Sequence, residues 1–307
     1  MNQLNDFIDG RTRLYGLFAH PAVHSLSPLM HNLSFRRRQI NAVYLAFDIT
    51  SDFSDAIRSI RQLNMGGVNL SMPFKKQVIP YLNELTPTAK MVGAVNTVVH
   101  RQGHLIGANT DGTGFFANLR ARHYTLRGKT ATVLGAGGAG LSIIAAGASE
   151  GLGMIHVFKR RNVTFPKVEA KLREFAQIYQ TPILLHAYDD QTDLKRAVRA
   201  SDFLINTTNI GMGNDRQSMP LTGEEMGALL PSSVVCDIIY EPRKTRLLQE
   251  AEARGCETVN GLGMLIYQGA QSFKLWTHEE MPVVAVTAAI EKESETNSET
   301  NNGGNRS

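Results

Sequence analysis

The chain is poor in cysteine and has no long apolar run. Its only two cysteines, Cys236 and Cys256, do not form a C-x-x-C pair. We therefore expect neither a disulfide framework nor a cysteine-based zinc site, which is typical of a protein in a reducing cytoplasm. We also expect no other metal site. No stretch reaches the roughly 18 apolar residues of a membrane-spanning helix. The opening residues MNQLNDFIDG also lack the pattern of a secretion signal.

Strong charge of one sign is also missing. The net charge is +4, and the basic residues are dispersed along the chain. This balance argues against a nucleic-acid partner and, with the lack of apolar runs, against a membrane partner. The richest basic cluster, Arg36-Arg37-Arg38, follows an apolar helical segment and is interpreted as its solvated face.

What is present fits a two-domain enzyme. A length of 307 residues with 42% hydrophobic residues suits about two domains that each bury a core. Strand and helix patterns alternate along both halves, which predicts an α/β fold. Beyond Ile290 the sequence EKESETNSETNNGGNRS has no apolar residue, and we expect residues 291–307 to be disordered.

Three helical patterns in the first half carry specific expectations. In residues 28–39, helical spacing is predicted to place Leu29, Leu33 and the stem of Arg36 on one side of the helix. Residues 53–63 form an amphipathic pattern whose buried face would carry Phe53, Ile57, Ile60 and Leu63. A further helix is expected from Lys75 to Leu82, just after a short strand over residues 66–71.

The most informative stretch is residues 130–158. An apolar strand, 130–134, leads directly into a G-x-G-x-x-G motif at Gly135, Gly137 and Gly140, which opens an alanine-rich helix. A second strand follows at residues 154–158. In this context the glycines indicate a dinucleotide site: one for the tight turn, one for close approach of the pyrophosphate, and one for helix-strand packing. The free N–H groups and dipole at the helix start would hold the phosphates.

The first half carries polar residues at the ends of its predicted strands. Ser25 and Ser27 precede a helix that opens with Pro28, an arrangement that suits a small carboxylate. The alternative is that Ser27 is simply a helix cap. Lys75 follows the strand in VNLSMPFKK, and Asp111 stands at a turn into a helix, where it could also be a cap. A lysine and an aspartate can move a proton while hydride leaves the same carbon.

Eight segments of the chain together resemble the shikimate dehydrogenase family. They are HSLSPLMHN, NLSMPFK, GAVNT, NTDG, VLGAGGAG, NTTNIGM, DIIYEP and NGLGMLIYQGAQSF, in the order that the family has them. The resemblance covers residues 15–276. It implies the reversible reduction of 3-dehydroshikimate to shikimate, in the chorismate branch of aromatic amino acid biosynthesis.

The resemblance also implies an architecture. Residues 1–112 with the C-terminal helices 264–290 would form an α/β catalytic domain. Residues 113–263 would form a Rossmann-like NAD(P)-binding domain, with the active site in an interdomain cleft.

Roles for individual residues follow from the same resemblance. The catalytic pair would be Lys75 and Asp111. Ser25, Ser27 and Tyr240 would hold the substrate carboxylate, and Ser71, Asn96, Asp111 and Gln268 the ring hydroxyls. The family usually has threonine at the position of Ser71, and serine keeps the hydroxyl. The segment 206–212 would lie on the nicotinamide side. The implied cofactor-binding residues are Gly135, Ala136, Gly137, Gly138, Ala139, Lys159, Arg160, Arg161, Asn162, Thr208, Ile238 and Gly261.

The cofactor choice depends on the end of the second Rossmann strand. An NAD-selective site usually has an acid there, but no Asp or Glu occurs between Met154 and Lys167. Lys159, Arg160 and Arg161 stand there instead, and they suit the 2′-phosphate of NADP. The trio departs from the family's common Asn-Arg-Thr pattern and looks more like the quinate/shikimate dehydrogenase subgroup. NADP is therefore favoured and NAD stays open, while a merely solvated strand end is the alternative.

Three questions stay open at this point. Quinate is a second candidate substrate, because it differs from shikimate at the carboxylate-bearing carbon. A non-catalytic nucleotide or metabolite sensor could use the same fold. Intact Lys75 and Asp111 argue against the sensor. The oligomeric state, a homodimer included, does not follow from the sequence.

Overall fold

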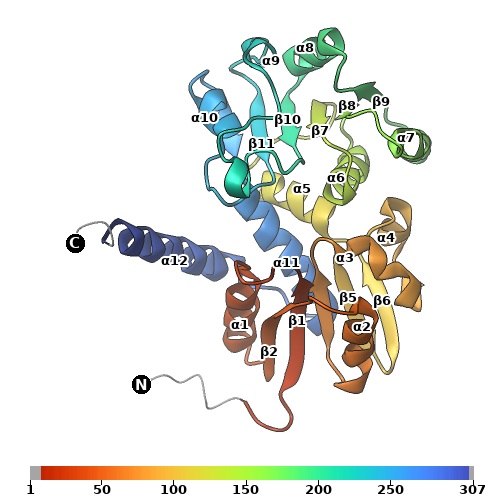
Figure 1. Cartoon of the computed structure of the whole chain (residues 1–307), viewed down its shortest axis with the longest axis vertical. Coiled ribbons are helices and arrows are strands. Elements are labelled where there is room, and N and C mark those ends of the chain that lie inside the picture. The colour runs from red at the N-terminus through yellow and green to blue at the C-terminus, as the bar shows by residue number, and fades with distance from the viewer. Residues whose placement is uncertain (1–7, 304–307) are drawn as a thin grey trace. The chain divides into compact units, whose positions relative to one another are not determined.

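A computed structural model describes residues 8–303 and divides the chain into two compact units (Figure 1). Unit 1 takes the chain up to Thr110 together with the chain from Ile266 onward, and unit 2 is Asp111–Leu265. Among the residues described, each unit has its own six-stranded sheet. The α/β class predicted from the alternating patterns is confirmed.

The sheet of unit 1 is mixed. Its strand order is β2(Ala42–Asp48), β1(Arg13–Ala19), β3(Gly67–Leu70), β5(Thr97–Arg101), β6(His104–Ala108) and β4(Glu84–Leu85). β1 pairs in parallel with both β2 and β3, whereas β5 is antiparallel to β3 and to β6. The hairpin between β5 and β6 turns at Arg101-Gln102-Gly103. Asn69 is opposite Thr97, and Thr97 is opposite Ala108. The end of β3, the start of β5 and the end of β6 therefore lie at one edge.

One face of this sheet packs on apolar side chains from α2(Phe53–Gln62) and α3(Phe74–Gln77), including Phe53, Ile57 and Phe74. The rings of Phe53 and Phe74 stack with centroids 4.4 Å apart. Two further elements follow α3 in the chain, the 3-10 helix Ile79–Tyr81 and α4(Pro87–Val92).

A second cluster in unit 1 is aromatic. It joins Tyr15 of β1 and Tyr44 of β2 to α1(Ser27–Arg37) and α11(Gly261–Thr277). Trp276 of α11 donates its indole N–H to the carbonyl of Val98, 3.0 Å away. A Cβ on Gly67 would lie 2.4 Å from that indole nitrogen, so a glycine is required where the tryptophan crosses the sheet. α12(Val283–Gly303) packs against α1.

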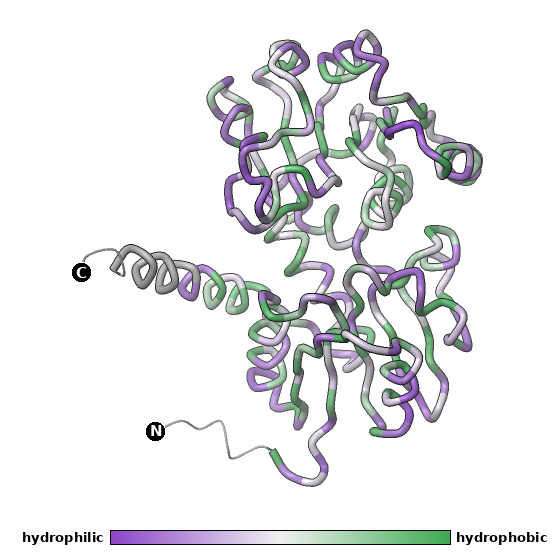
Figure 2. Tube along the Cα trace, in the orientation of Figure 1, coloured by the Kyte–Doolittle hydropathy of each residue, from purple (hydrophilic) through white to green (hydrophobic). Residues whose placement is uncertain are grey.

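The sheet of unit 2 is wholly parallel, in the order β12(Glu257–Val259), β11(Val234–Asp237), β10(Phe203–Asn206), β7(Thr130–Leu134), β8(Met154–Lys159) and β9(Ile183–Ala187). This is the doubly wound order, in which the direction of winding changes between β7 and β10. Figure 2 shows the central strands as mostly hydrophobic, which is typical of a sheet covered on both faces.

The helices of unit 2 are α5(Asp111–Ala121), α6(Gly138–Ser149), α7(Phe165–Tyr179), α8(Gln191–Ala200), α9(Gly223–Gly227) and α10(Arg246–Glu252), with a 3-10 turn at Gly213–Asp215. α6 packs on α5 and α7, while α8 packs on α9. Leu134, Phe158, Leu204 and Val235 share a core with α8, α9 and α10. Since side chains alternate along a strand, their neighbours Val133, Val157 and Ile205 face the other side of the sheet.

Several sequence-based expectations need correction. The buried face of α1 carries Met30, His31, Ser34 and Phe35, whereas Leu29 and Leu33 are only partly buried. Leu63 follows α2 and is 62% exposed. The helix predicted over 75–82 is α3 followed by a 3-10 turn, since Pro80 has no N–H for a continuous α-helix. The basic trio Arg36-Arg37-Arg38 is exposed, as predicted.

The C-terminal segment also differs from expectation. The structure continues α12 to Gly303, through most of the stretch in which we expect disorder. The helix is anchored by buried Val286 and Ile290, and once a helix is nucleated each further residue adds one hydrogen bond. Residues 304–307 lie outside the described part of the chain.

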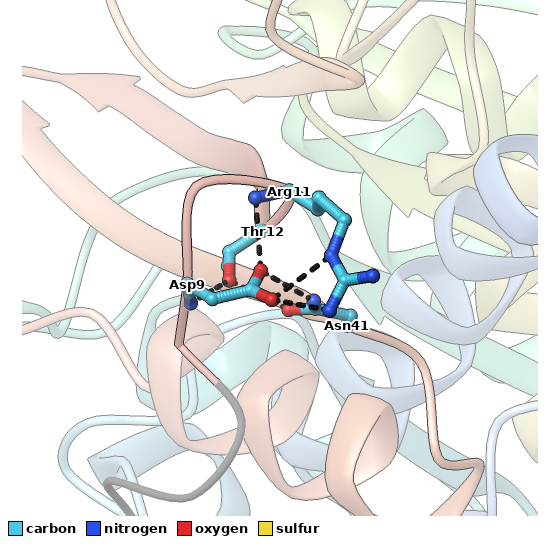
Figure 3. A network of polar contacts seen from close by, with 4 residues as sticks. All are labelled: Asp9, Arg11, Thr12 and Asn41. Carbon is cyan, nitrogen blue, oxygen red and sulfur yellow. Dashed lines mark hydrogen bonds and ion pairs between the residues drawn. The ribbon is translucent and has the colours of Figure 1, made fainter.

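The entry to β1 is fixed by a polar network (Figure 3). The Asp9 carboxylate accepts hydrogen bonds from the backbone and guanidinium of Arg11 and from the Asn41 amide. Thr12 donates to Asn41 across 2.6 Å. These bonds hold the pKa of Asp9 below its usual value, with the Arg11 side chain as the main cause. The network lies where β1 and β2 begin, at the opposite edge of the sheet from the residues discussed next.

Within residues 8–303, no helix has the length and apolar character needed to cross a membrane. The same part of the chain contains no group of three or more potential metal ligands, and Cys236 and Cys256 are buried free thiols.

Candidate functional site

The topology of unit 1 gathers most of the predicted substrate residues at one edge of its sheet. The loop after β1 carries Ser25 and leads to Ser27 at the start of α1, and Ser71 directly follows β3. Asn96 immediately precedes β5, whose start is paired with the ends of β3 and β6. Lys75 lies on the short helix α3, which begins three residues after Ser71. Residues far apart in the sequence thus meet because parallel and antiparallel strands share this edge.

Ser25 and Ser27 have different local roles. The cap position of α1 is Leu26, which has no side-chain capping bond, so the interpretation of Ser27 as a simple cap is wrong. Ser25 Oγ instead accepts the backbone N–H of Ser27 at 3.2 Å. Ser27 is 6% exposed, so its side chain lies within the packed structure at the start of α1. The two serines are therefore tied into the buried structure.

A buried polar network supports Asn96 and Gln268. Asn96 donates to Thr110 Oγ1 at 2.8 Å and to Gln268 Oε1 at 3.0 Å, and its own Oδ1 accepts the N–H of Thr110. Behind them, Thr97 and Ser272 share a 2.7 Å hydrogen bond, and Asn69 donates to both. Since buried polar groups are costly unless paired, this network fixes the side chains at the sheet edge.

Asn96 and Gln268 are held in place by residues to which the sequence motifs assign no role: Tyr44, Asn69, Thr97, Thr110 and Ser272. All five are buried. The available signal was the presence of amide and hydroxyl side chains in segments that otherwise read as apolar core.

The two members of the proposed catalytic pair occupy different elements. Lys75 is half-buried on α3, and its carbonyl accepts the N–H of Val95 at 2.8 Å, which ties α3 to the chain before β5. Phe74, beside it, points into the core against Phe53. Asp111 is buried and begins α5, the first helix of unit 2.

His31 lies in the aromatic cluster beneath this edge. It is fully buried, stacks on Tyr44 with ring centroids 4.4 Å apart, and contacts Trp276. Within the described residues neither ring nitrogen has a partner at hydrogen-bond geometry. Burial lowers the pKa of His31 to about 3, and the neighbouring Asn69 amide offsets this only in part.

The depressed pKa of His31 predicts acid lability of unit 1. The unfolded chain binds the proton near pH 6.5 and the folded chain does not, so stability is full above pH 6.5 and falls as the pH drops toward 3. At about pH 4.5 the loss from this group is about 2–3 kcal/mol. Urea unfolding followed by the fluorescence of Trp276, the sole tryptophan, measures it in unit 1. His31→Phe should flatten the pH dependence by about that amount; an unchanged slope would contradict this role of His31.

Unit 2 carries the glycine loop at the point where the sheet winding changes. Gly135 has φ +103°, and a Cβ there would lie 2.8 Å from Thr207 Oγ1. A Cβ on Gly140 would lie 2.7 Å from the same oxygen and 2.8 Å from the carbonyl of Gly135. Gly137 differs, because a Cβ there would meet no protein atom within 4 Å. Gly135 and Gly140 are thus required by the fold, whereas Gly137 leaves open space in front of α6.

The start of α6 is suited to an anion. Gly137 is its cap residue, no side chain caps the helix, and its first turn holds no acid. The orphan N–H groups and the positive end of the helix dipole therefore face that open space. Ala136, Gly138 and Ala139 line the same turn and add little bulk. These features fit the pyrophosphate of a dinucleotide.

The basic segment follows β8. Lys159 donates to Asn162 Oδ1 at 3.1 Å, and the same oxygen accepts from the backbone and hydroxyl of Thr164. Asn162 is therefore committed to the turn before α7. Arg160 is exposed. Arg161 lies over the Phe165 ring, with 5.5 Å from Cζ to the centroid.

Asp237 anchors the segments assigned to the nicotinamide side. Its carboxylate accepts hydrogen bonds from Asn206 Nδ2, the N–H of Ile239 and Thr245 Oγ1. Asn206 Oδ1 in turn accepts from Thr208, so one buried carboxylate fixes the ends of β10 and β11. Burial raises the pKa of Asp237 to about 6, against these hydrogen bonds.

Three predicted residues lie in the chain after β11. Ile238 donates its N–H to the carbonyl of Asn206. A Cβ on Gly261 would lie 2.0 Å from the carbonyl of Ile238, so glycine is needed for this close approach. Burial raises the pKa of Tyr240, which keeps its hydroxyl protonated near neutral pH.

Comparison with known proteins identifies the family. Residues 17–98 match the shikimate dehydrogenase substrate binding domain, and residues 261–291 match the shikimate 5′-dehydrogenase C-terminal domain. A shikimate dehydrogenase (NADP(+)) of Streptococcus suis is 43% identical over 277 residues, which cover 90% of this chain and 94% of that protein. The chain belongs to the shikimate dehydrogenase family.

Solved structures agree with this assignment. Shikimate 5-dehydrogenase of Listeria monocytogenes, in complex with shikimate and NAD, has a TM-score of 0.87 and 38% identity, covering 94% of this chain and 100% of that one. The shikimate 5-dehydrogenase of Thermus thermophilus, in complex with NADP(H) and shikimate, has a TM-score of 0.78 and 31% identity over 92% of this chain and 99% of that one. The resemblance inferred from eight sequence motifs is confirmed.

Proposed function

We propose that this chain is an NADP-dependent shikimate dehydrogenase, which interconverts 3-dehydroshikimate and shikimate. The observation that carries the proposal is the 43% sequence identity to a shikimate dehydrogenase, in an alignment that covers 90% of this chain. A nucleotide-binding loop alone would suit many reactions. The polar edge of unit 1 and the glycine loop of unit 2 support it. Cys236 and Cys256 are free thiols, which supports a cytoplasmic location as part of the proposal.

The proposed substrate contacts use the polar edge of unit 1. Ser25 and Ser27, with Tyr240 of unit 2, would bind the carboxylate. Ser71, Asn96 and Gln268 would bind ring hydroxyls. Asn96 and Gln268 are already joined by a 3.0 Å hydrogen bond, which supports a shared role.

NADP, when bound, supplies the acceptor for the hydride that leaves shikimate. The proton of the same hydroxyl needs a separate acceptor, and we assign it to the amine of Lys75. Asp111 would hydrogen-bond the reacting hydroxyl and its neighbour. In the reverse direction Lys75 returns the proton to the new alkoxide oxygen.

The proposed cofactor contacts lie in unit 2. The N–H groups of residues 135–139 would bind the pyrophosphate, and Lys159, Arg160 and Arg161 the 2′-phosphate. Asn162 would contribute mainly through the turn that it holds. Thr208, Ile238 and Gly261 would border the nicotinamide.

The carboxylate pocket predicts a selective change in substrate binding. Ser25→Ala or Tyr240→Phe should raise KM for shikimate, each removing a hydrogen bond to a charged group that is worth about 1.5–3 kcal/mol. Affinity for NADP should change little. Ser59→Ala on α2, away from the sheet edge, serves as the control. If KM for shikimate stays at the parent value in both variants, the pocket assignment fails.

The basic segment predicts a preference for NADP over NAD. Arg160→Ala should reduce this preference, and the preference itself should shrink as salt is added, because exposed charges are screened. Arg173→Ala on α7 changes the net charge equally at another exposed position and should leave the preference intact. The kcat/KM ratio for the two cofactors measures it. A tenfold or larger preference for NAD in the parent enzyme would refute the assignment.

The activity is tested by following the absorbance of reduced cofactor with shikimate or quinate as substrate and NADP or NAD as acceptor. We expect shikimate with NADP to give the highest kcat/KM. Higher efficiency with quinate would reassign the substrate. Binding of both ligands without any reduced cofactor would instead support a sensor.

A further inference from the structure

An acidic side chain reaches the basic segment from the loop that follows the neighbouring strand. β8 and β9 pair in parallel as far as Lys159 and Ala187, so the segments that follow them leave the sheet at the same end. Arg161 Nε lies 3.7 Å from Asp189 Oδ1. Both residues line a shallow surface hollow together with Asp190, Gln191 and Thr192. Residues 154–167 contain no acid, and Asp189 brings a carboxylate close to Arg161 from the loop after β9.

The pair between Arg161 and Asp189 is exposed, with side-chain exposures of 69% and 74%. Exposed ion pairs contribute little to folding stability, so the fold does not depend on this contact. The ion pair instead affects how strongly an anion can bind at Arg161. A phosphate must share the guanidinium with the carboxylate and also meets its negative charge.

Asp190, the adjacent acid, is directed elsewhere. Its carboxylate accepts the N–H of Asp193 at 3.0 Å and caps α8. Two neighbouring aspartates therefore have separate tasks, one at a helix start and one at Arg161. This difference gives a matched control for any experiment on Asp189.

We propose that Asp189 is a specificity-determining residue for the cofactor, acting through Arg161. It lowers the preference for a 2′-phosphate below the value that Lys159, Arg160 and Arg161 would otherwise give. NAD, which has a hydroxyl in place of that phosphate, does not compete for Arg161 and is unaffected. The inference rests on the proposed binding of NADP at this segment.

Asp189→Asn should tighten binding of NADP and of its fragment 2′,5′-ADP by about two- to fivefold at low salt, with NAD affinity unchanged. Isothermal titration calorimetry on the full chain measures all three without any turnover. The gain should be largest at about 0.01 M ionic strength and should vanish near 1 M, where the screening length is about 3 Å.

Asp190→Asn is the matched control, because it makes the same change in net charge and keeps a residue able to cap α8. It should leave 2′,5′-ADP affinity close to the parent value. Arg161→Ala completes a double-mutant cycle: in its background, Asp189→Asn should have no effect.

The outcomes separate the two proposals. Equal gains in the Asp189 and Asp190 variants, or a gain that persists without Arg161, would overturn the role of Asp189. An Asp189→Asn variant that binds 2′,5′-ADP with the affinity of the parent protein would also overturn the role of Asp189. A parent protein that binds NAD but neither NADP nor 2′,5′-ADP would contradict the proposed NADP use as well.

Discussion

Replacement of Lys75 by alanine is expected to lower kcat by roughly 10²–10⁴, with a much smaller change in KM for shikimate. The reason is that hydride can leave the substrate carbon only as the hydroxyl proton is removed. Without the amine, water has to accept that proton. Steady-state kinetics with varied shikimate at saturating NADP separates the two constants.

The same helix offers a control for this variant. Lys76 is the exposed neighbour of Lys75 on α3, and Lys76→Ala should keep both constants near the parent values. Asp111→Asn should change both kcat and KM, because that residue is assigned a contact to the substrate as well. A Lys75→Ala enzyme with near-normal kcat and a raised KM would make Lys75 a binding residue only.

Gly137→Ala is expected to weaken NADP binding by tenfold or more, or about 1.4 kcal/mol, while lowering the melting temperature only slightly, because alanine is a poorer helix cap than glycine. The added Cβ meets no protein atom within 4 Å, and the backbone at φ −77° accepts alanine without strain. It would stand where the pyrophosphate is proposed to approach α6. Calorimetric titration with NADP, beside thermal unfolding, gives both quantities.

Two other glycines complete this test. Gly227→Ala on α9 also adds a Cβ into open space; it should leave NADP binding unchanged and stabilise the fold slightly, since alanine is the better helix former. Gly140→Ala should instead destabilise the fold by about 1–3 kcal/mol, because its Cβ would press on Thr207 and on the carbonyl of Gly135. If Gly137→Ala binds NADP with the affinity of the parent protein, the proposal that the pyrophosphate binds at this turn is wrong.

The fold of unit 2 was predictable where pattern and chemistry agreed. The strand over residues 130–134 and the glycine turn after it match β7 and α6 closely, since apolar β-branched residues and glycines both indicate them. The face of α1 was not predictable in the same way. It is buried through His31 and Ser34, whose side chains hydropathy counts as polar.

Short elements were missed for a related reason. β4, α4, α9 and β12 have between two and six residues, too few for a period to appear. Leu63 was assigned to a buried face by its spacing, but α2 ends before it and leaves the side chain exposed.

For the candidate site, motifs named residues but could not give their supports. Thr97 and Ser272 are 175 positions apart and share a hydrogen bond only because α11 crosses the sheet at β5. The contact of Asp189 with Arg161 depends in the same way on the pairing of β8 with β9. The catalytic and binding roles given to Lys75, Asp111 and the other named residues stay predictions until their variants are measured.

The central claim is that this chain catalyses the oxidation of shikimate by NADP and that Lys75 accepts the hydroxyl proton. A single-turnover experiment tests it most directly: enzyme in excess over shikimate, NADP saturating, and absorbance of reduced cofactor followed after mixing. The account predicts that NADPH forms in a shikimate-dependent single turnover, with 3-dehydroshikimate formed in equal amount. The rate constant of this turnover should fall by roughly 10² or more in Lys75→Ala. Bound shikimate and bound NADP with no NADPH formed in the parent enzyme would contradict it.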